Sequence, residues 1–291
     1  MLPAQPAGQS MSKVENQSWT PPTGKVPGAD IQRDADTPAD VEARIAVCEE
    51  LWGPDHLVPG QNSSTQPSAG TVMSCDTGIH CLIGVGLLGV RPDYGAFAHE
   101  TDIFEGDPAV AAFHQAARPP AEARARLIVW DGAAAPEPGR YSRISTRWAL
   151  AAVTDPAGLA TQLASALQPG GELYLDELWV TDADVGRRLG GVLGLWRADL
   201  AFPKRKKVLE SLFGQLVLRE VTERASALMR EIRDALADRE DMQLRMKNLP
   251  DEVRRLRAPA LARELERALI LFDALNRGQV AASRHIFQRP A

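Results

Sequence analysis

Cysteine is scarce in this sequence, and long hydrophobic runs are missing. The three cysteines, Cys48, Cys75 and Cys81, form an odd set without a C-x-x-C pair. This excludes a disulfide framework and favours a reducing, cytoplasmic environment. The longest apolar run, residues 81–90, is about half the length of a membrane span and holds three glycines. No transmembrane helix is therefore expected, and the protein is not expected to act at a membrane.

The sequence also has no basic excess and no apolar leader. It contains 33 Lys and Arg against 38 Asp and Glu, with a formal net charge of -5. Proteins that bind nucleic acids usually carry an excess of basic residues, so a nucleic-acid partner is not expected. The basic run PKRKK (203–207) follows a Phe-Pro turn and is interpreted as a solvated helix start. The first residues lack the apolar core of a signal peptide, which again favours the cytoplasm.

Two regions of different composition follow one another along the chain. Residues 1–37 are rich in Pro, Gly, Gln, Ser and Asp without periodicity, which predicts a disordered N-terminal tail. From Thr37 the pattern becomes helical, with Thr37 or Asp40 as N-cap and apolar residues up to Trp52 on one face. Hydrophobic residues make up 44% of the 291 residues, as in ordinary globular proteins. We therefore expect one folded domain over residues 38–291.

Short apolar segments then alternate with helical ones. Strands are predicted at TVMSC (71–75), GAFAHE (95–100), ARLIVWD (125–131), within RISTRWALAAV (143–153), and at ELYLDELWV (172–180). HCLIGVGLLGV (80–90) is interpreted as a buried helix or loop, and helices are predicted at 107–117 and 156–167. This alternation predicts an α/β fold, a Rossmann-like doubly wound, mostly parallel sheet with helices on both faces.

The last third of the chain is mostly helical. Two long charged helices, about 225–247 and 250–277, carry many Arg/Glu pairs at helical spacing, which is typical of solvated faces. They lie between two strand-like segments, 214–223 and 279–288. We expect a long C-terminal helical insertion over about 224–277 between these strands. Its surface is a candidate for a protein partner or for self-association.

The segment GVGLLG (84–89) matches the dinucleotide-binding pattern G-x-G-x-x-G. That pattern carries meaning when a strand runs into it, a helix leaves it and an acid follows about 20 residues later. Here Pro92 follows Gly89 closely and Glu100 is only 11 residues beyond it. On these grounds the glycines are interpreted as a site of close packing. A nicotinamide-dependent enzyme stays open as a third alternative.

A second turn, around Gly78, satisfies the spacing better. VMSCDTGIH (72–80) has a predicted strand before it and an apolar segment after it. Glu100 follows Gly78 by 22 residues, at the end of the next predicted strand. This arrangement is typical of a turn and an acid that together hold a nucleoside-bearing cofactor.

The order of these segments resembles that of the class I S-adenosylmethionine-dependent methyltransferases. The resemblance covers residues 39–291 and depends on five segments: LWGPDHLVPG (51–60), SCDTGIH (74–80), ETD (100–102), VWD (129–131) and LASALQPGGELYLDEL (163–178). It implies a seven-stranded sheet with an antiparallel last strand and S-adenosylmethionine as cofactor. It also implies methyl transfer to a small molecule. The loop departs from the family's acid-x-G-x-G-x-G, since Gly78 alone keeps a glycine place while Asp76 and His80 occupy the outer ones.

The resemblance implies roles for individual residues. It places the cofactor-binding residues at Asp76, Gly78, His80, Glu100, Asp102, Trp130 and Asp131. The acid at the second strand would hold the ribose hydroxyls, and Trp130 with Asp131 would contact the adenine. His56 and Glu177 are the candidates for a general base near the substrate. No metal site is expected. The alternative is a catalytically inactive protein of the same fold that binds a ligand or a protein, because the loop has lost its outer glycines.

Overall fold

The computed structural model describes residues 37–53, 78–84, 100–116, 125–130, 135–153, 155–181, 185 and 205–291. Contacts divide the chain into two units, Met1–Arg33 and Asp34–Ala291, and every described residue belongs to the second. The predicted tail and the predicted strand 71–75 lie outside the described residues.

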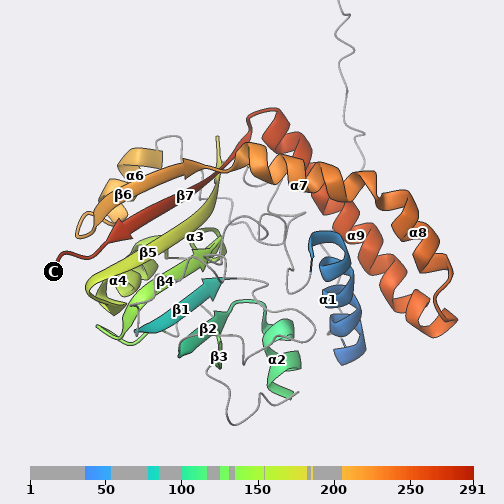
Figure 1. Cartoon of the computed structure of the whole chain (residues 1–291), viewed down its shortest axis with the longest axis horizontal. Helices are drawn as coiled ribbons and strands as arrows, with labels where there is room; N and C mark the ends of the chain where they lie inside the picture. Colours follow the sequence, from blue (N-terminus) through green and yellow to red (C-terminus); the bar gives the residue numbers. More distant parts are fainter. Residues whose placement is uncertain are drawn as a thin grey trace, which may run out of the picture. The chain divides into compact units, whose positions relative to one another are not determined.

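A seven-stranded sheet forms the centre of the domain (Figure 1). Its order is β3-β2-β1-β4-β5-β7-β6. The first five strands are parallel, and β7 runs antiparallel to both β5 and β6. The sheet confirms the predicted fold class, including the antiparallel strand near the end of the sheet. The strands are β1 Ile79–Gly84, β2 Thr101–Glu105, β3 Ala125–Val129, β4 Tyr141–Arg147, β5 Leu167–Val180, β6 Val217–Glu223 and β7 Val280–Gln288.

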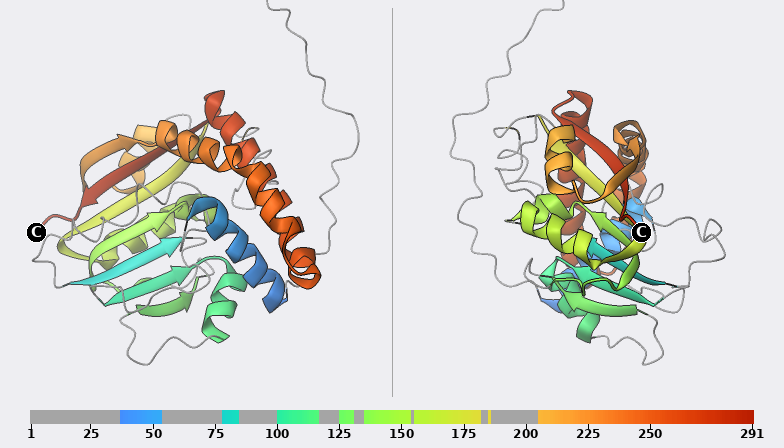
Figure 2. Two further views of the ribbon diagram at one scale, coloured as in Figure 1. Left: turned by 45° about the vertical axis from the view of Figure 1, so that its right-hand side comes forward. Right: turned by 90° about the vertical axis from the view of Figure 1, so that its left-hand side faces the viewer.

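Helices cover both faces of this sheet (Figure 2). One face packs on α1 (Pro38–Trp52), α2 (Pro108–Ala116), α7 (Ala225–Ala237), α8 (Arg239–Lys247) and α9 (Asp251–Asn276). The other face packs on α3 (Ala149–Ala152), α4 (Pro156–Ala166) and α6 (Arg205–Leu212). Residue parity along each strand decides the face, as in β1, where Cys81 and Ile83 face α4 and Leu82 faces α1.

The start of α1 and the C-terminal helices follow the sequence closely. Thr37 caps α1 in a capping box with Asp40: its hydroxyl accepts the Asp40 N–H at 3.2 Å, and the Asp40 carboxylate accepts the Thr37 N–H at 3.0 Å. The predicted helix 225–247 divides into α7 and α8 at Asp238, and α9 spans the second predicted helix. α9 packs against α1 and α7. Among the described residues, no helix combines the length and apolarity that a membrane span needs.

The first two strands lie elsewhere than the sequence suggested. The interpretation of residues 80–90 as a helix or loop is wrong for its first half, because Ile79–Gly84 is the central strand β1. A parallel strand with both faces buried is a continuous apolar run, whose period does not distinguish it from a buried helix. β2 is Thr101–Glu105, so Glu100 precedes this strand instead of ending it; the other residues of the predicted strand 95–100 lie outside the described residues.

Candidate functional site

The sheet reverses its winding direction between β1 and β4. β1 pairs with β2 on one side and with β4 on the other, and all three are parallel. The connections after such strands leave in opposite directions, which opens a crevice at their carboxyl ends where α/β proteins bind ligands. Gly84 ends β1 there, and its register partner Arg147 ends β4.

Gly84 permits the close approach of these two strands. A Cβ at this position would lie 2.5 Å from the Arg147 carbonyl oxygen, so any larger residue would clash with the β4 backbone. Gly84 is also the first glycine of GVGLLG, so a strand does run into that pattern. The close packing expected of these glycines is observed at Gly84. Residues 85–89 lie outside the described residues.

Glu105 is an acid at the spacing that the pattern describes, counted from Gly84. It ends β2 and follows Gly84 by 105 − 84 = 21 residues. The backbone ties the two strand ends together, since the Gly106 N–H donates to the Gly84 carbonyl at 2.6 Å. The Glu105 side chain is fully buried, and its Oε1 accepts the Asp107 N–H at 2.8 Å. Sequence analysis missed Glu105 because it counted the spacing from Gly89 and from Gly78.

Trp130 stands beside Glu105 at the same edge. It follows β3 directly, is buried, and donates its backbone N–H to the Glu105 carbonyl at 2.9 Å. Its position at the end of the third strand is the one that the sequence predicted, whereas Asp131 lies outside the described residues. The carboxyl ends of β1, β2, β3 and β4 thus bring together Gly84, Glu105, Trp130 and Arg147.

Arg147 is a buried cation at this edge. Burial lowers the pKa of its guanidinium to about 10, and the nearby carboxylates of Asp176, Glu105 and Glu231 oppose that shift. Asp176 is itself held by Arg284 on β7 through two hydrogen bonds of 2.9 and 2.5 Å. The carboxyl edge therefore combines the buried charges of Glu105 and Arg147 with half-buried charges from β5, β7 and α7.

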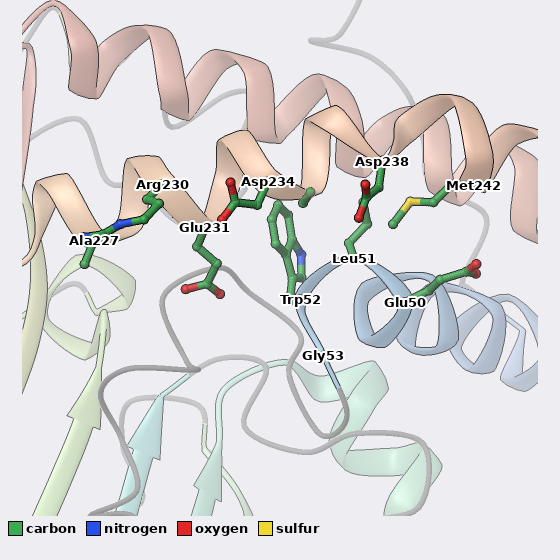
Figure 3. A pocket seen from close by; sticks show the side chains of 11 residues that line it. Glu50, Leu51, Trp52, Gly53, Ala227, Arg230, Glu231, Asp234, Asp238 and Met242 are labelled. Carbon is green, nitrogen blue, oxygen red and sulfur yellow. The ribbon is translucent and has the colours of Figure 1, made fainter.

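A pocket of about 550 Å³ lies between the end of α1 and α7 (Figure 3). Trp52 extends from α1 toward α7, where the Glu231 and Asp234 side chains flank it. Four of the lining residues carry a carboxylate and one, Arg230, carries a positive charge; the carboxylates belong to Glu50, Glu231, Asp234 and Asp238. Glu231 also interacts electrostatically with Arg147, so the pocket adjoins the charged edge of the sheet.

The turn around Gly78 lies at the opposite edge. Gly78 precedes β1, and His80 belongs to the strand. The His80 N–H donates to the Glu100 carbonyl at 2.8 Å, so the two strands are in direct backbone contact there. The Glu100 carboxylate pairs with Arg140 at 2.7 Å. Gly78 and Glu100 therefore lie at the amino ends of β1 and β2, away from the carboxyl ends where α/β proteins bind ligands.

Asp102 belongs to a structural ion cluster. Its buried carboxylate accepts two hydrogen bonds of 2.9 Å from Arg126 and one of 2.7 Å from the Tyr141 hydroxyl. Burial raises the pKa of Asp102, but these hydrogen bonds and the charge of Arg140 outweigh it, so the pKa lies below its ordinary value. Burial, and then the hydrogen bond to Asp102, raise the pKa of Tyr141. With these partners, Asp102 holds β2, β3 and β4 together at their amino ends.

Of the two candidate bases, Glu177 and His56, the structure describes Glu177 alone. Glu177 lies inside β5 rather than at its end, is buried, and accepts the Leu150 N–H at 2.9 Å at the start of α3. This bond supports the turn in which Trp148 adopts a left-handed φ of 50°. His56 and Asp76 lie outside the described residues. Among the residues that are described, no three His, Cys, Asp or Glu side chains are grouped as metal ligands.

Comparison with solved structures assigns the fold. Phosphoethanolamine N-methyltransferase 2 of Haemonchus contortus, solved with phosphomonomethylethanolamine and S-adenosylhomocysteine, superimposes with a TM-score of 0.58 at 14% identity. The match covers 86% of this chain and 58% of that enzyme, so this chain spans little more than half of its length. This chain has the class I S-adenosylmethionine-dependent methyltransferase fold.

Two further structures share this methyltransferase fold. One is a protein from Galdieria sulphuraria described as a sarcosine dimethylglycine methyltransferase, with a TM-score of 0.52 at 14% identity. The match covers 74% of this chain and 79% of that protein. The other is the [4+2]-cyclase SpnF, with a TM-score of 0.51, 16% identity, and 75% and 77% covered. In sequence, no family model and no curated protein matches the chain.

Proposed function

We propose that this protein binds S-adenosylmethionine at the carboxyl ends of β1 and β2 and transfers its methyl group to a small molecule. The proposal depends on one observation: β1 ends on the first glycine of GVGLLG at the reversal point of the sheet, with Glu105 ending the neighbouring strand. A nucleoside-bearing cofactor is typically held by glycines that follow the first strand and by an acid at the end of the second strand.

The residues at this edge fit that cofactor chemically. Glu105 Oε1 accepts the Asp107 N–H at 2.8 Å, and a carboxylate can accept hydrogen bonds from several donors at once; in our proposal the two ribose hydroxyls are among these donors. Trp130 provides an aromatic side chain at the end of β3, where an adenine would lie. The cofactor supplies a methyl group on a sulfonium for in-line displacement. The protein's part is to align the acceptor and exclude water, which needs no obligatory catalytic side chain.

A nicotinamide cofactor is a weaker interpretation of the same loop. The dinucleotide-binding fold has the order 3-2-1-4-5-6 in a mostly parallel sheet. Here antiparallel β7 lies between β5 and β6, and the solved structures that superimpose include methyltransferases.

We place the methyl acceptor in the pocket between α1 and α7. The pocket adjoins Arg147 through Glu231, and therefore lies next to the edge that would hold the cofactor. Arg245 pairs with the Glu50 carboxylate at 2.9 Å, and the carboxylates of Glu231, Asp234 and Asp238 still outnumber the one lining arginine, so the electrostatic potential of the pocket favours a small acceptor with a cationic group, such as an organic amine. The Trp52 ring adds an aromatic wall against which a cation is stabilised.

As a second candidate function, a protein of this fold could catalyse a reaction other than methyl transfer, or no reaction. The superposition with SpnF supports it, because that protein is a cyclase. A fold can host several chemistries, so cofactor binding and methyl transfer need separate measurements.

Calorimetric titration of matched variants tests the cofactor site. Glu105 and Glu100 flank the same strand, one at each end, and Glu→Gln keeps the shape of either side chain. Since charged hydrogen bonds contribute about 1.5–3 kcal/mol each, Glu105→Gln should weaken S-adenosylmethionine binding at least about tenfold. Glu100→Gln should leave the affinity within about twofold.

If Glu100→Gln weakened S-adenosylmethionine binding more than Glu105→Gln, the cofactor site would instead lie at the turn around Gly78. Binding of NADH without S-adenosylmethionine or S-adenosylhomocysteine would support a nicotinamide enzyme. Binding of the methyl donor without turnover of any amine acceptor would favour the second candidate.

A further inference from the structure

A row of charged residues crosses the sheet at its carboxyl edge, on the face that α1, α7 and α9 cover. The strand register pairs Glu105 with Gly84, Gly84 with Arg147, Arg147 with Asp176 and Asp176 with Arg284. Residues paired in this way on neighbouring strands present their side chains to the same face of a sheet. From β2 to β7 the row thus consists of an acid, a glycine, a base, an acid and a base (Figure 1).

Gly84 leaves the space between Glu105 and Arg147 without a side chain. Neighbouring strands lie about 4.8 Å apart, so the backbones of Glu105 and Arg147 are about 10 Å apart across β1. A Glu and an Arg side chain together can span this distance, and Arg147 interacts electrostatically with Glu105. A Cβ on Gly84 would lie 3.2 Å from the Arg147 Cβ, so a larger residue would also press on the Arg147 side chain.

Arg147 supplies the positive charge that a buried Glu105 needs. Glu105 is fully buried and Arg147 is 4% exposed. A buried carboxylate stays ionised when a cation and hydrogen-bond donors stabilise it. Asp176 attracts Arg147 from the other side, but Arg284 already donates to both oxygens of Asp176. An ionised carboxylate accepts hydrogen bonds at both oxygens and donates none, which is the form that two ribose hydroxyls require.

We propose that Arg147 is a positioning residue for the cofactor, which holds the Glu105 carboxylate ionised and oriented at the carboxyl edge of β2. The inference rests on the proposed function, because Glu105 is the residue for which we propose contact with the cofactor. Arg147 acts through Glu105 and needs no contact with the cofactor itself. Arg143 is its matched control: it lies on the same face at the other end of β4, where it pairs with Glu172 at 3.7 Å.

A double-mutant cycle on S-adenosylhomocysteine affinity tests this role. In calorimetric titration, Arg147→Met removes the charge and should raise the dissociation constant at least about tenfold. Arg147→Lys keeps the charge without the planar guanidinium and should raise it about three- to fivefold. In a Glu105→Gln background no carboxylate is left to position, so each replacement should change the constant less than about twofold. Arg143→Met should leave it within about twofold.

Far-UV circular dichroism and thermal melting establish which variants fold, and the Arg147→Lys arm completes the cycle if Arg147→Met does not fold. A change below about twofold for every folded Arg147 variant, or an equal loss in the Glu105→Gln background, would overturn the positioning role and leave the proposed cofactor site standing. Unchanged affinity in Glu105→Gln itself, or no binding to the wild type, would overturn the proposed cofactor site and this inference with it.

Discussion

Two acids of β2 show how position decides the role of a side chain. Asp102 and Glu105 are both buried carboxylates of one five-residue strand. Asp102 lies near its amino end among Arg126, Arg140 and Tyr141, and Glu105 ends the strand at the reversal point of the sheet. The first therefore stabilises the fold, and the second is the residue for which we propose contact with the cofactor.

Replacing Asp102 by Asn should lower the stability of the protein in a pH-dependent way. The folded-state pKa of Asp102 is below its ordinary value, so its contribution is complete above about pH 5 and is lost as the pH falls through that lower pKa. Denaturant unfolding should show Asp102→Asn less stable by about 1–3 kcal/mol at pH 7, with a smaller difference at pH 3.

Glu137→Gln is the matched control for this prediction, because its exposed ion pair with Arg140 should contribute less than about 0.5 kcal/mol. A difference between Asp102→Asn and the wild type that stays constant from pH 7 to pH 3 would contradict the assigned charge state.

At the scale of elements, α7 connects the sheet to the pocket. One face buries Leu228, Ile232 and Ala235, and another presents Glu231 and Asp234 to the pocket. The acidic wall is thus a consequence of helical periodicity on an amphipathic helix that packs against α1 and α9.

Asp234→Asn should weaken the use of cationic acceptors specifically. Because Asp234 is exposed, its charge contributes about 0.2–1 kcal/mol, which corresponds to a fall of about 1.4- to 5-fold in kcat/KM at low salt. Steady-state methyl-transfer assays with an amine and a neutral acceptor measure this. Asp241→Asn on α8 makes the same charge change at an exposed residue outside the pocket lining and serves as control. Equal losses for both acceptors would contradict the electrostatic role.

For the molecule as a whole, cofactor binding should increase the free energy of unfolding. A ligand that binds the folded state alone adds about 2.7 kcal/mol to the free energy of unfolding at one hundred times its dissociation constant. S-adenosylhomocysteine should do so in the wild type, and Glu105→Gln should need at least about tenfold more of it for the same effect. An unfolding midpoint that is independent of S-adenosylhomocysteine up to millimolar concentration would argue against the site.

Local patterns in the sequence determined most of the elements. A helix N-cap at Thr37 or Asp40, a strand-like segment over 279–288 and the charged periodicity of α9 were predicted, because each depends on residues a few positions apart. The order of strands and helices, together with the family resemblance, was sufficient for the fold class. Trp130 was placed correctly because it directly follows a strand with a clear boundary.

The tertiary structure alone decided which strand is central, and with it the edge at which we propose the cofactor site. Ile79–Gly84 is buried on both faces by distant helices, so its apolar run has no period that marks it as a strand. With Ile79–Gly84 as the central strand, the proposed cofactor site involves Gly84 and Glu105 instead of Gly78 and Glu100. The proximity of Gly84 to Arg147, 63 residues later, is likewise a consequence of strand pairing, which short-range sequence patterns do not encode.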